Sequence, residues 1–202
     1  MTLARMTTFA AVLALGTAQF AIAQETENSA PAENAAEPAD DLSLGEPADQ
    51  VGRPYIKEVV KDWSLRCIKG QSADEDERCQ MYQLLKDDQD APIVEVSIFK
   101  LPEGGRALAG ATVVAPLETA LQQQLTIQVD SGQARKYPFA FCNPVGCYAR
   151  IGFTAEDVAS FKRGNAAKVT IYPFVAPDQK VELNMSLSGF TDAFDKASTL
   201  TQ

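Results

Sequence analysis

Two short stretches decide the fold class: residues 63–67 read WSLRC, and residues 79–84 read CQMYQL. In each stretch large apolar side chains alternate with polar ones, which is the pattern of a β-strand with one buried and one wet face. The residues between the two stretches are mostly polar and acidic. We therefore expect two paired strands joined by a solvated loop, with Trp63, the single tryptophan, in the core.

The rest of the body repeats this alternation of strands and turns. Further strands are expected over residues 93–99, 111–115, 125–129, 137–141, 147–153, 169–175 and 181–187. Turn signals separate them, such as PEGG at residues 102–105, DSG at 130–132 and PD at 177–178. Many short strands without repeated strand–helix units predict an all-β sandwich or barrel and argue against a parallel sheet.

Residues 154–164 form the clearest helical segment. Thr154 can cap its N-terminus, and Asp157 stands at the capping-box position. Acidic residues lie in its first turn and basic residues in its last, and Gly164 stands where a C-terminal glycine cap is expected. Residues 190–200 are expected to hold one or two further helical turns. The predicted class is therefore all-β with one or two short helices.

The body contains four cysteines, Cys67, Cys79, Cys142 and Cys147. Residues 1–23 have the form of an export signal, and an even number of cysteines in an exported chain indicates disulfides. Four cysteines allow three connectivities, among which sequence alone does not select. The local pairing, 67–79 with 142–147, is the simplest. Loop-closure entropy assigns about 3 kcal/mol to the larger ring and about 2 kcal/mol to the smaller.

A metal site or a redox pair is the competing interpretation of these cysteines. A zinc site normally has C-x2-C spacing and often histidine, and a thioredoxin-like pair needs C-x-x-C. This chain has neither spacing and no histidine at all. We therefore expect structural disulfides, no metal and no cofactor.

The first 23 residues have the three parts of a cleavable export signal. Arg5 gives a positive start, residues 9–15 (FAAVLAL) form a compact apolar run, and a small-x-small pattern ends at Ala23, so cleavage is expected between Ala23 and Gln24. The apolar run is too short for a membrane-spanning helix, which needs roughly 20 apolar residues, and no later segment approaches that length. We therefore expect a mature chain without a transmembrane segment, in the periplasm or secreted to the outer surface.

Residues 24–54 are expected to be an acidic, disordered tether. Residues 24–50 hold eight acidic residues, no lysine or arginine, and much Ala, Pro, Asn and Ser. Such a composition buries too little apolar surface to offset its chain entropy. The body, residues 55–202, has the length of one domain and is nearly neutral. Nothing in this charge distribution resembles a nucleic-acid-binding surface.

The sequence shows no catalytic constellation. The absence of histidine excludes Ser-His-Asp and Cys-His catalysis. The acidic clusters at residues 74–77 and 87–90 lack EF-hand spacing, and residues 102–106 lack the lysine of a P-loop, so all three are expected to be solvated loops. A hydrolase with two converging carboxylates stays open, because sequence does not show which acids meet. The leading expectation is a protein without enzymatic activity.

The order of several motifs resembles the invasion-associated locus B family of exported bacterial proteins. The motifs are DWSLRC at residues 62–67, CQMYQ at 79–83, VDSG at 129–132, PFAFC at 138–142 with Gly146-Cys147, and SLSGFT at 186–191. The resemblance implies an immunoglobulin-like β-sandwich in the periplasm or on the outer surface, with no known enzymatic activity and no catalytic residues to carry over. The family's name comes from members that assist bacterial entry into host cells.

Two functional hypotheses follow. The first is a periplasmic or cell-surface binding module that contacts an unidentified protein partner, in the envelope or at the host surface, through an exposed sheet edge or a loop. Host-cell interaction or invasion would be one use of such a module. The second is a structural or stress-protective protein attached to the outer membrane or the cell wall.

Overall fold

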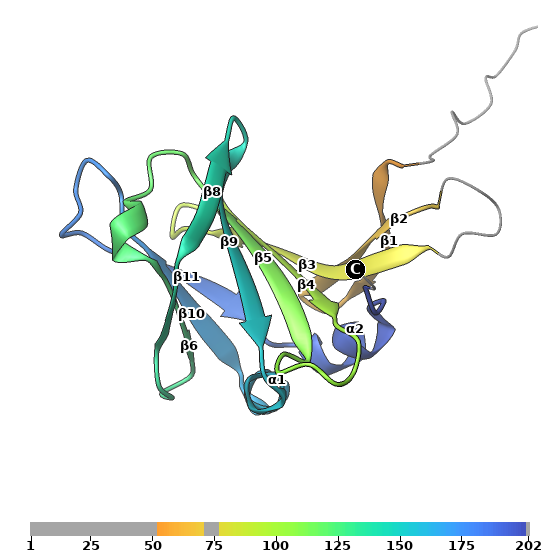
Figure 1. Cartoon of the computed structure of the whole chain (residues 1–202). Helices are drawn as coiled ribbons and strands as arrows, with labels where there is room; N and C mark the ends of the chain where they lie inside the picture. The colour runs from red at the N-terminus through yellow and green to blue at the C-terminus, as the bar shows by residue number, and fades with distance from the viewer. Residues whose placement is uncertain (1–51, 71–76, 201–202) are drawn as a thin grey trace, which may run out of the picture. The chain divides into compact units, whose positions relative to one another are not determined.

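The computed structural model describes residues 52–70 and 77–200, which form two antiparallel sheets and two short helices (Figure 1). The expected signal peptide with its cleavage site, most of the expected tether and most of the acidic cluster at residues 74–77 lie outside the described residues. No helix within the described ranges is both long and apolar enough to cross a membrane.

The larger sheet has seven strands in the order β1-β2-β3-β4-β5-β9-β8. These strands are β1 (Pro54–Val60), β2 (Trp63–Ile68), β3 (Arg78–Lys86), β4 (Pro92–Lys100), β5 (Ala109–Ala115), β8 (Phe139–Asn143) and β9 (Gly146–Phe153). The first five follow one another as antiparallel neighbours. The strands predicted at residues 63–67, 79–84, 93–99, 111–115 and 147–153 are confirmed.

The smaller sheet has four strands in the order β11-β10-β6-β7. They are β6 (Leu125–Val129), β7 (Arg135–Tyr137), β10 (Ala166–Ile171) and β11 (Val181–Ser186). The single strand predicted over residues 137–141 is wrong, because Tyr137 ends β7 in this sheet and Phe139 begins β8 in the other. Pro138 lies at the crossing, where a residue without an N–H interrupts the ladder.

Two further strand predictions differ from the structure. The sequence predicts no strand before residue 63, yet β1 is present, and a bulge between Ile56 and Glu58 breaks the period-two pattern that would reveal it. The strand predicted over residues 169–175 begins earlier, at Ala166, and ends at Ile171. Phe174 and Val175 lie in the following loop and are 73% and 81% exposed.

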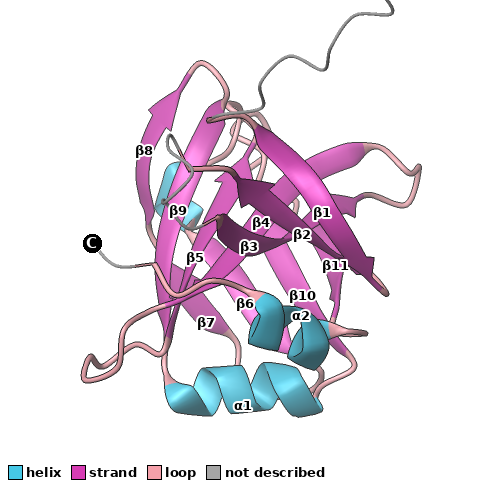
Figure 2. Ribbon diagram, turned by 90° about the vertical axis from the view of Figure 1, so that its right-hand side faces the viewer, coloured by secondary structure: helices cyan, strands magenta, loops and turns pink. Residues whose placement is uncertain are grey.

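The helices α1 (Ala155–Arg163) and α2 (Phe190–Lys196) lie at the same end of the sandwich (Figure 2). The predicted capping box of α1 is confirmed, since Asp157 N donates to Thr154 Oγ1 at 3.2 Å and Thr154 N donates to Asp157 Oδ2 at 2.9 Å. Gly164 does not adopt the left-handed conformation of a glycine cap, because its φ is −77°. Close packing explains the glycine, since a Cβ would lie 2.7 Å from Val129 Cγ1.

The inner faces of both sheets and the two helices enclose one core. Trp63 is fully buried, its Nε1 donates to Ser186 O at 3.0 Å, and its ring meets the ring of Phe190 edge-on at 5.6 Å. Gln83, which is also buried, donates through Nε2 to Ser186 O at 3.1 Å and accepts from Ser186 N at 2.9 Å. These contacts join β2 and β3 to β11, so the core position predicted for Trp63 and the predicted all-β sandwich are confirmed.

Candidate functional site

The four cysteines form two disulfides, Cys67–Cys79 and Cys142–Cys147, with S–S distances of 2.02 and 2.04 Å. This is the local pairing among the three connectivities. Each disulfide joins directly opposite residues of neighbouring antiparallel strands, β2 with β3 and β8 with β9. No cysteine is left free for nucleophilic chemistry.

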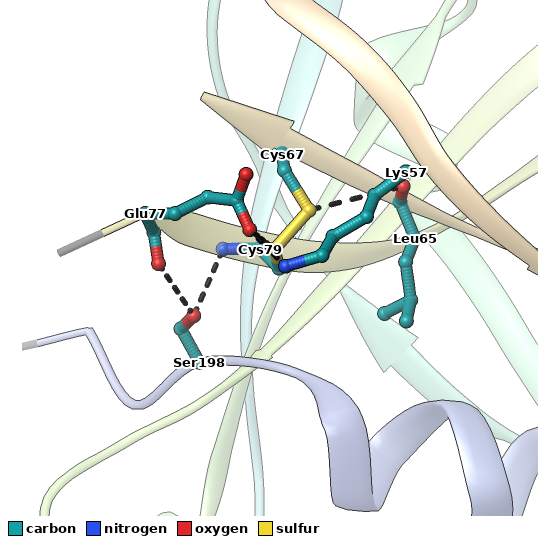
Figure 3. Close-up of a disulfide and its surroundings, with 6 residues drawn as sticks. All are labelled: Lys57, Leu65, Cys67, Glu77, Cys79 and Ser198. Carbon is teal, nitrogen blue, oxygen red and sulfur yellow. Dashed lines mark hydrogen bonds and ion pairs between the residues drawn. A yellow bond between two sulfur atoms is a disulfide. The ribbon is translucent and has the colours of Figure 1, made fainter. Parts of the chain in front are cut away.

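The Cys67–Cys79 disulfide is buried and is fixed by the C-terminal segment (Figure 3). Cys79 N donates to Ser198 Oγ at 2.9 Å, Ser198 N donates to Cys79 O at 2.8 Å, and Ser198 Oγ donates to Glu77 O at 3.3 Å. The carboxylate of Glu77 forms an ion pair with Lys57. The surroundings of this disulfide therefore tie the end of the chain to the start of β3.

Cys67, Glu77 and Cys79 also bring ligand-type atoms within 4.8 Å of one another, and they form the one such cluster in the described part of the chain. Metal-binding cysteines act as thiolates. Because the two sulfur atoms are bonded to each other, this cluster offers a metal no thiolate. The disulfide reading explains the cluster.

A depression of about 170 Å³ between the β6–β7 hairpin and α1 contains two neighbouring acids, Glu156 and Asp157. Asp157 is already engaged: Oδ2 accepts hydrogen bonds from Thr154 N and Thr154 Oγ1, and Oδ1 lies 3.2 Å from Arg135. A glycosidase needs two acids that flank the scissile bond. One of this pair is occupied with helix capping, so the depression does not supply such a site.

Tyr137 lies in the same depression. Burial raises the pKa of its hydroxyl above the ordinary value of tyrosine, the neighbouring carboxylate of Asp157 raises it further, and Arg135 opposes the rise. The phenol therefore keeps its proton at neutral pH and is not a base there.

Exposed large apolar side chains concentrate at one end of the sandwich. Among the described residues ten such side chains are exposed, and six of them belong to two loops and one hairpin. Leu117 and Leu121 come from the β5–β6 loop, Phe141 and Val145 from the β8–β9 hairpin, and Phe174 and Val175 from the β10–β11 loop. We call this surface the apolar loop end; in Figure 1 it lies at the upper left, and β1 lies on the right.

The strand registers bring these loops together. Ala115 is opposite Cys147, so the chain segments that carry Leu117 and Val145 leave the sheet side by side. The β5–β6 and β10–β11 loops are tied by the hydrogen bonds Phe174 N to Glu118 O and Ala120 N to Tyr172 O, both 2.7 Å long. The rings of Phe141 and Tyr148 stack with centroids 4.8 Å apart. The sheet order, and not closeness in sequence, creates this surface.

A groove of about 610 Å³ runs between the short 3-10 helix η2 (Leu121–Gln123) and the β10–β11 loop. Its apolar lining comes from Leu117, Ala120, Leu121, Phe174 and Pro177, and its polar lining from Glu118, Thr119, Gln122 and Gln123. Binding pockets typically measure about 300–1,000 Å³ and combine apolar walls with a few polar groups. The groove fits that description.

The sequence pattern does not predict this surface, because it places Phe174 and Val175 in a strand. A signal was present: Pro173 and Pro177 bracket these residues, and proline inside an apolar run argues against a strand. The four predicted site residues, the cysteines, do not line the groove. They are structural, and one pair closes the hairpin that carries Val145.

Comparison with known proteins identifies relatives that cover most of the sandwich. Residues 63–198 match the family model described as invasion associated locus B (IalB) protein. Two invasion protein B homologs, from Brucella abortus strain 2308 and from Brucella abortus biovar 1 strain 9-941, are each 28% identical over 151 residues, which cover 75% of this chain and 84% of the relative.

A solved structure, that of invasion associated protein B from Bartonella henselae, has the same fold. It superimposes with a TM-score of 0.54 at 24% sequence identity, covering 67% of this chain and 90% of that protein. The family match contains Trp63, which links the two sheets, and all four cysteines, whose disulfides join neighbouring strands of the larger sheet. The chain belongs to the invasion associated locus B family.

Proposed function

We propose that this protein is an exported, non-enzymatic binding module of the bacterial envelope that engages a protein partner through the apolar loop end. One observation carries the proposal: six of the ten exposed large apolar side chains among the described residues lie on two loops and the adjacent β8–β9 hairpin. Exposed apolar side chains that gather on one surface, and are not scattered singly, are typical of an interaction site.

The energetics support a binding surface. Fully burying one Leu, Val or Phe side chain contributes about 1.5–3 kcal/mol. Phe174 and Val175 are among the most exposed apolar residues described, so a partner that covers them would remove much apolar area from water. The loops project from paired strands and are tied by backbone hydrogen bonds, which lowers the entropic cost of binding.

Export agrees with the chemistry of the chain. The first 23 residues have the form of a cleavable signal, and disulfides persist in oxidising compartments. The relatives from Brucella abortus are named invasion protein B homologs. We propose, on the basis of that name, that this chain also serves host-cell interaction or invasion. Its partner would lie in the envelope or at a host-cell surface.

Substitution of the loops tests the proposal. The triple variant Leu117→Ser, Phe174→Ser, Val175→Ser removes apolar surface at the loop end, and Ile56→Ser, Val59→Ser, Leu108→Ser removes three exposed apolar side chains elsewhere as the matched control. After chemical cross-linking in the native envelope, the wild type and the control should yield the same cross-linked protein partner, and the loop variant should lose it.

Two results would contradict the proposal. If the loop variant keeps the partner, the apolar loop end is not the binding surface. If all three proteins instead sediment with cell-wall material and show no specific cross-link, a structural attachment to the envelope explains the protein better. Circular dichroism of each variant checks that the sandwich is intact.

A further inference from the structure

The charge around the apolar loop end points to the chemical class of its partner. We infer that the groove between η2 and the β10–β11 loop binds a polypeptide segment that carries both bulky apolar and basic side chains. This inference rests on the proposed function, because it names the partner for the same surface. Apolar contacts would supply the affinity, and the acidic rim would select the partner.

The loop end carries an excess of acidic residues. The turns and loops at this end, together with the strand-end residues that flank them, cover residues 86–91, 116–124, 143–146 and 172–182 and contain six acidic residues and two lysines. The β3–β4 turn belongs to this end because β4 starts beside the end of β5, with Glu95 opposite Val114. The acidic residues are Asp87, Asp88, Asp90, Glu118, Asp178 and Glu182.

Both lysines at this end are already neutralised. Lys86 lies 2.9 Å from Asp90, and Lys180 lies 2.6 Å from Glu182. Asp88, Glu118 and Asp178 form no ion pair within residues 52–70 and 77–200, and all three are exposed. Three carboxylates at this end are therefore free to meet basic groups of a partner.

Glu118 connects the charge to the groove. It lines the groove beside Leu117 and Phe174, and its backbone O accepts the hydrogen bond from Phe174 N that fixes the opposite wall. Asp178 follows Pro177, which also lines the groove. A bound segment that places an apolar side chain between Leu117 and Phe174 would bring its neighbouring side chains to these carboxylates.

The same charges disfavour the other occupants of an exposed apolar surface. Two copies docked by their loop ends would bring the acidic rims together, and like charges across an interface are costly. An anionic lipid surface or a nucleic acid would be repelled by the same carboxylates. A basic and apolar polypeptide is the occupant that matches both the lining and the rim.

Peptide binding to the full mature chain tests the inference. Three labelled peptides of equal length are compared by fluorescence anisotropy: one alternating Leu and Lys, one alternating Leu and Glu, and one alternating Ser and Lys. We expect the Leu/Lys peptide to bind at least about tenfold more tightly than either of the others, and its affinity to fall as salt screens the charges.

Two variants assign this binding to the groove. Glu118→Gln with Asp178→Asn should weaken the Leu/Lys peptide about threefold to tenfold, the effect of removing two exposed charge contacts. Phe174→Ser should weaken it about tenfold or more, because an apolar contact is lost. The control Glu103→Gln with Asp192→Asn neutralises two exposed acids outside the loop end and should leave the affinity unchanged. The acidic N-terminal segment is identical in every protein, so its attraction for a basic peptide cancels in the comparison.

Several results would overturn the inference. They are equal affinity for the Leu/Lys and Leu/Glu peptides, unchanged affinity in the Glu118→Gln, Asp178→Asn protein, or tighter association with vesicles rich in phosphatidylglycerol than with the Leu/Lys peptide. If these occur while the envelope partner still requires Leu117, Phe174 and Val175, the inference fails and the proposed function stands. If the partner no longer requires those residues, the proposed function itself fails.

Discussion

At the scale of single residues, Gly189 shows how the backbone joins β11 to α2. Its φ is +84°, and a Cβ at this position would lie 2.4 Å from Val60 O. Gly189→Ala should therefore lower the free energy of unfolding by about 1–3 kcal/mol, through backbone strain and the clash. Urea unfolding measures the change. Gly105→Ala is the control, because its nearest neighbour would be 3.7 Å away, and equal losses in both variants would contradict the packing described for Gly189.

Tyr137 should make the free energy of unfolding depend on pH in the alkaline range. Burial, then Asp157, raises the pKa of its hydroxyl, while Arg135 lowers it. A pKa that is higher in the folded state stabilises the fold below the ordinary tyrosine pKa of about 10, and this contribution is lost as pH rises through the folded value. Unfolding free energies measured across this alkaline range should fall more steeply for the wild type than for Tyr137→Phe. Parallel curves would contradict the assignment.

At the scale of elements, the two disulfides should differ in what they contribute. Cys67 and Cys79 close the longer ring, with a sequence separation of 12 against 5, and Cys79 also holds Ser198 of the C-terminal segment. Replacing this pair with serine should cost about 3 kcal/mol and replacing Cys142 and Cys147 about 2 kcal/mol, as loop entropy gives. Urea unfolding of the two double variants compares them. The reverse order would show that loop length and burial do not govern their contributions.

The sequence predicts those elements whose structure follows from a local pattern of residues. The alternation in β2 and β3, the capping box at Thr154 and the core position of Trp63 are readable because each follows from neighbouring residues. β1 is not readable, since its bulge breaks the period, and Phe174 and Val175 carry the composition of a strand in a loop. β1 is defined by its pairing with β2, and the loop that holds Phe174 by its contact with the β5–β6 loop, and neither contact leaves a periodic pattern in the sequence.

At the scale of the whole molecule, the candidate site is a product of topology. Leu117, Val145 and Phe174 are far apart in the chain and meet because β9 pairs with β5 and because the Thr119–Pro173 bridge joins two loops. No local sequence pattern predicts that these residues lie close together. The cysteines, which are conspicuous in the sequence, serve the scaffold.

The proposed export gives a separate prediction. Signal cleavage after Ala23 would make Gln24 the first residue of the mature protein. Intact-mass and N-terminal peptide analysis of protein recovered from the periplasm or the medium should show this terminus. Protein confined to the cytoplasm with Met1 or Thr2 at its N-terminus would contradict export.

We propose that the apolar loop end is the surface that contacts the partner. Site-specific photo-cross-linking in the native envelope tests it most directly, with a photoreactive phenylalanine placed at position 175 in one protein and at position 59 in another. Both positions are exposed valines, in the β10–β11 loop and in β1. We expect one reproducible protein adduct from position 175 and none from position 59. The same adduct from both positions, or from position 59 alone, would contradict it.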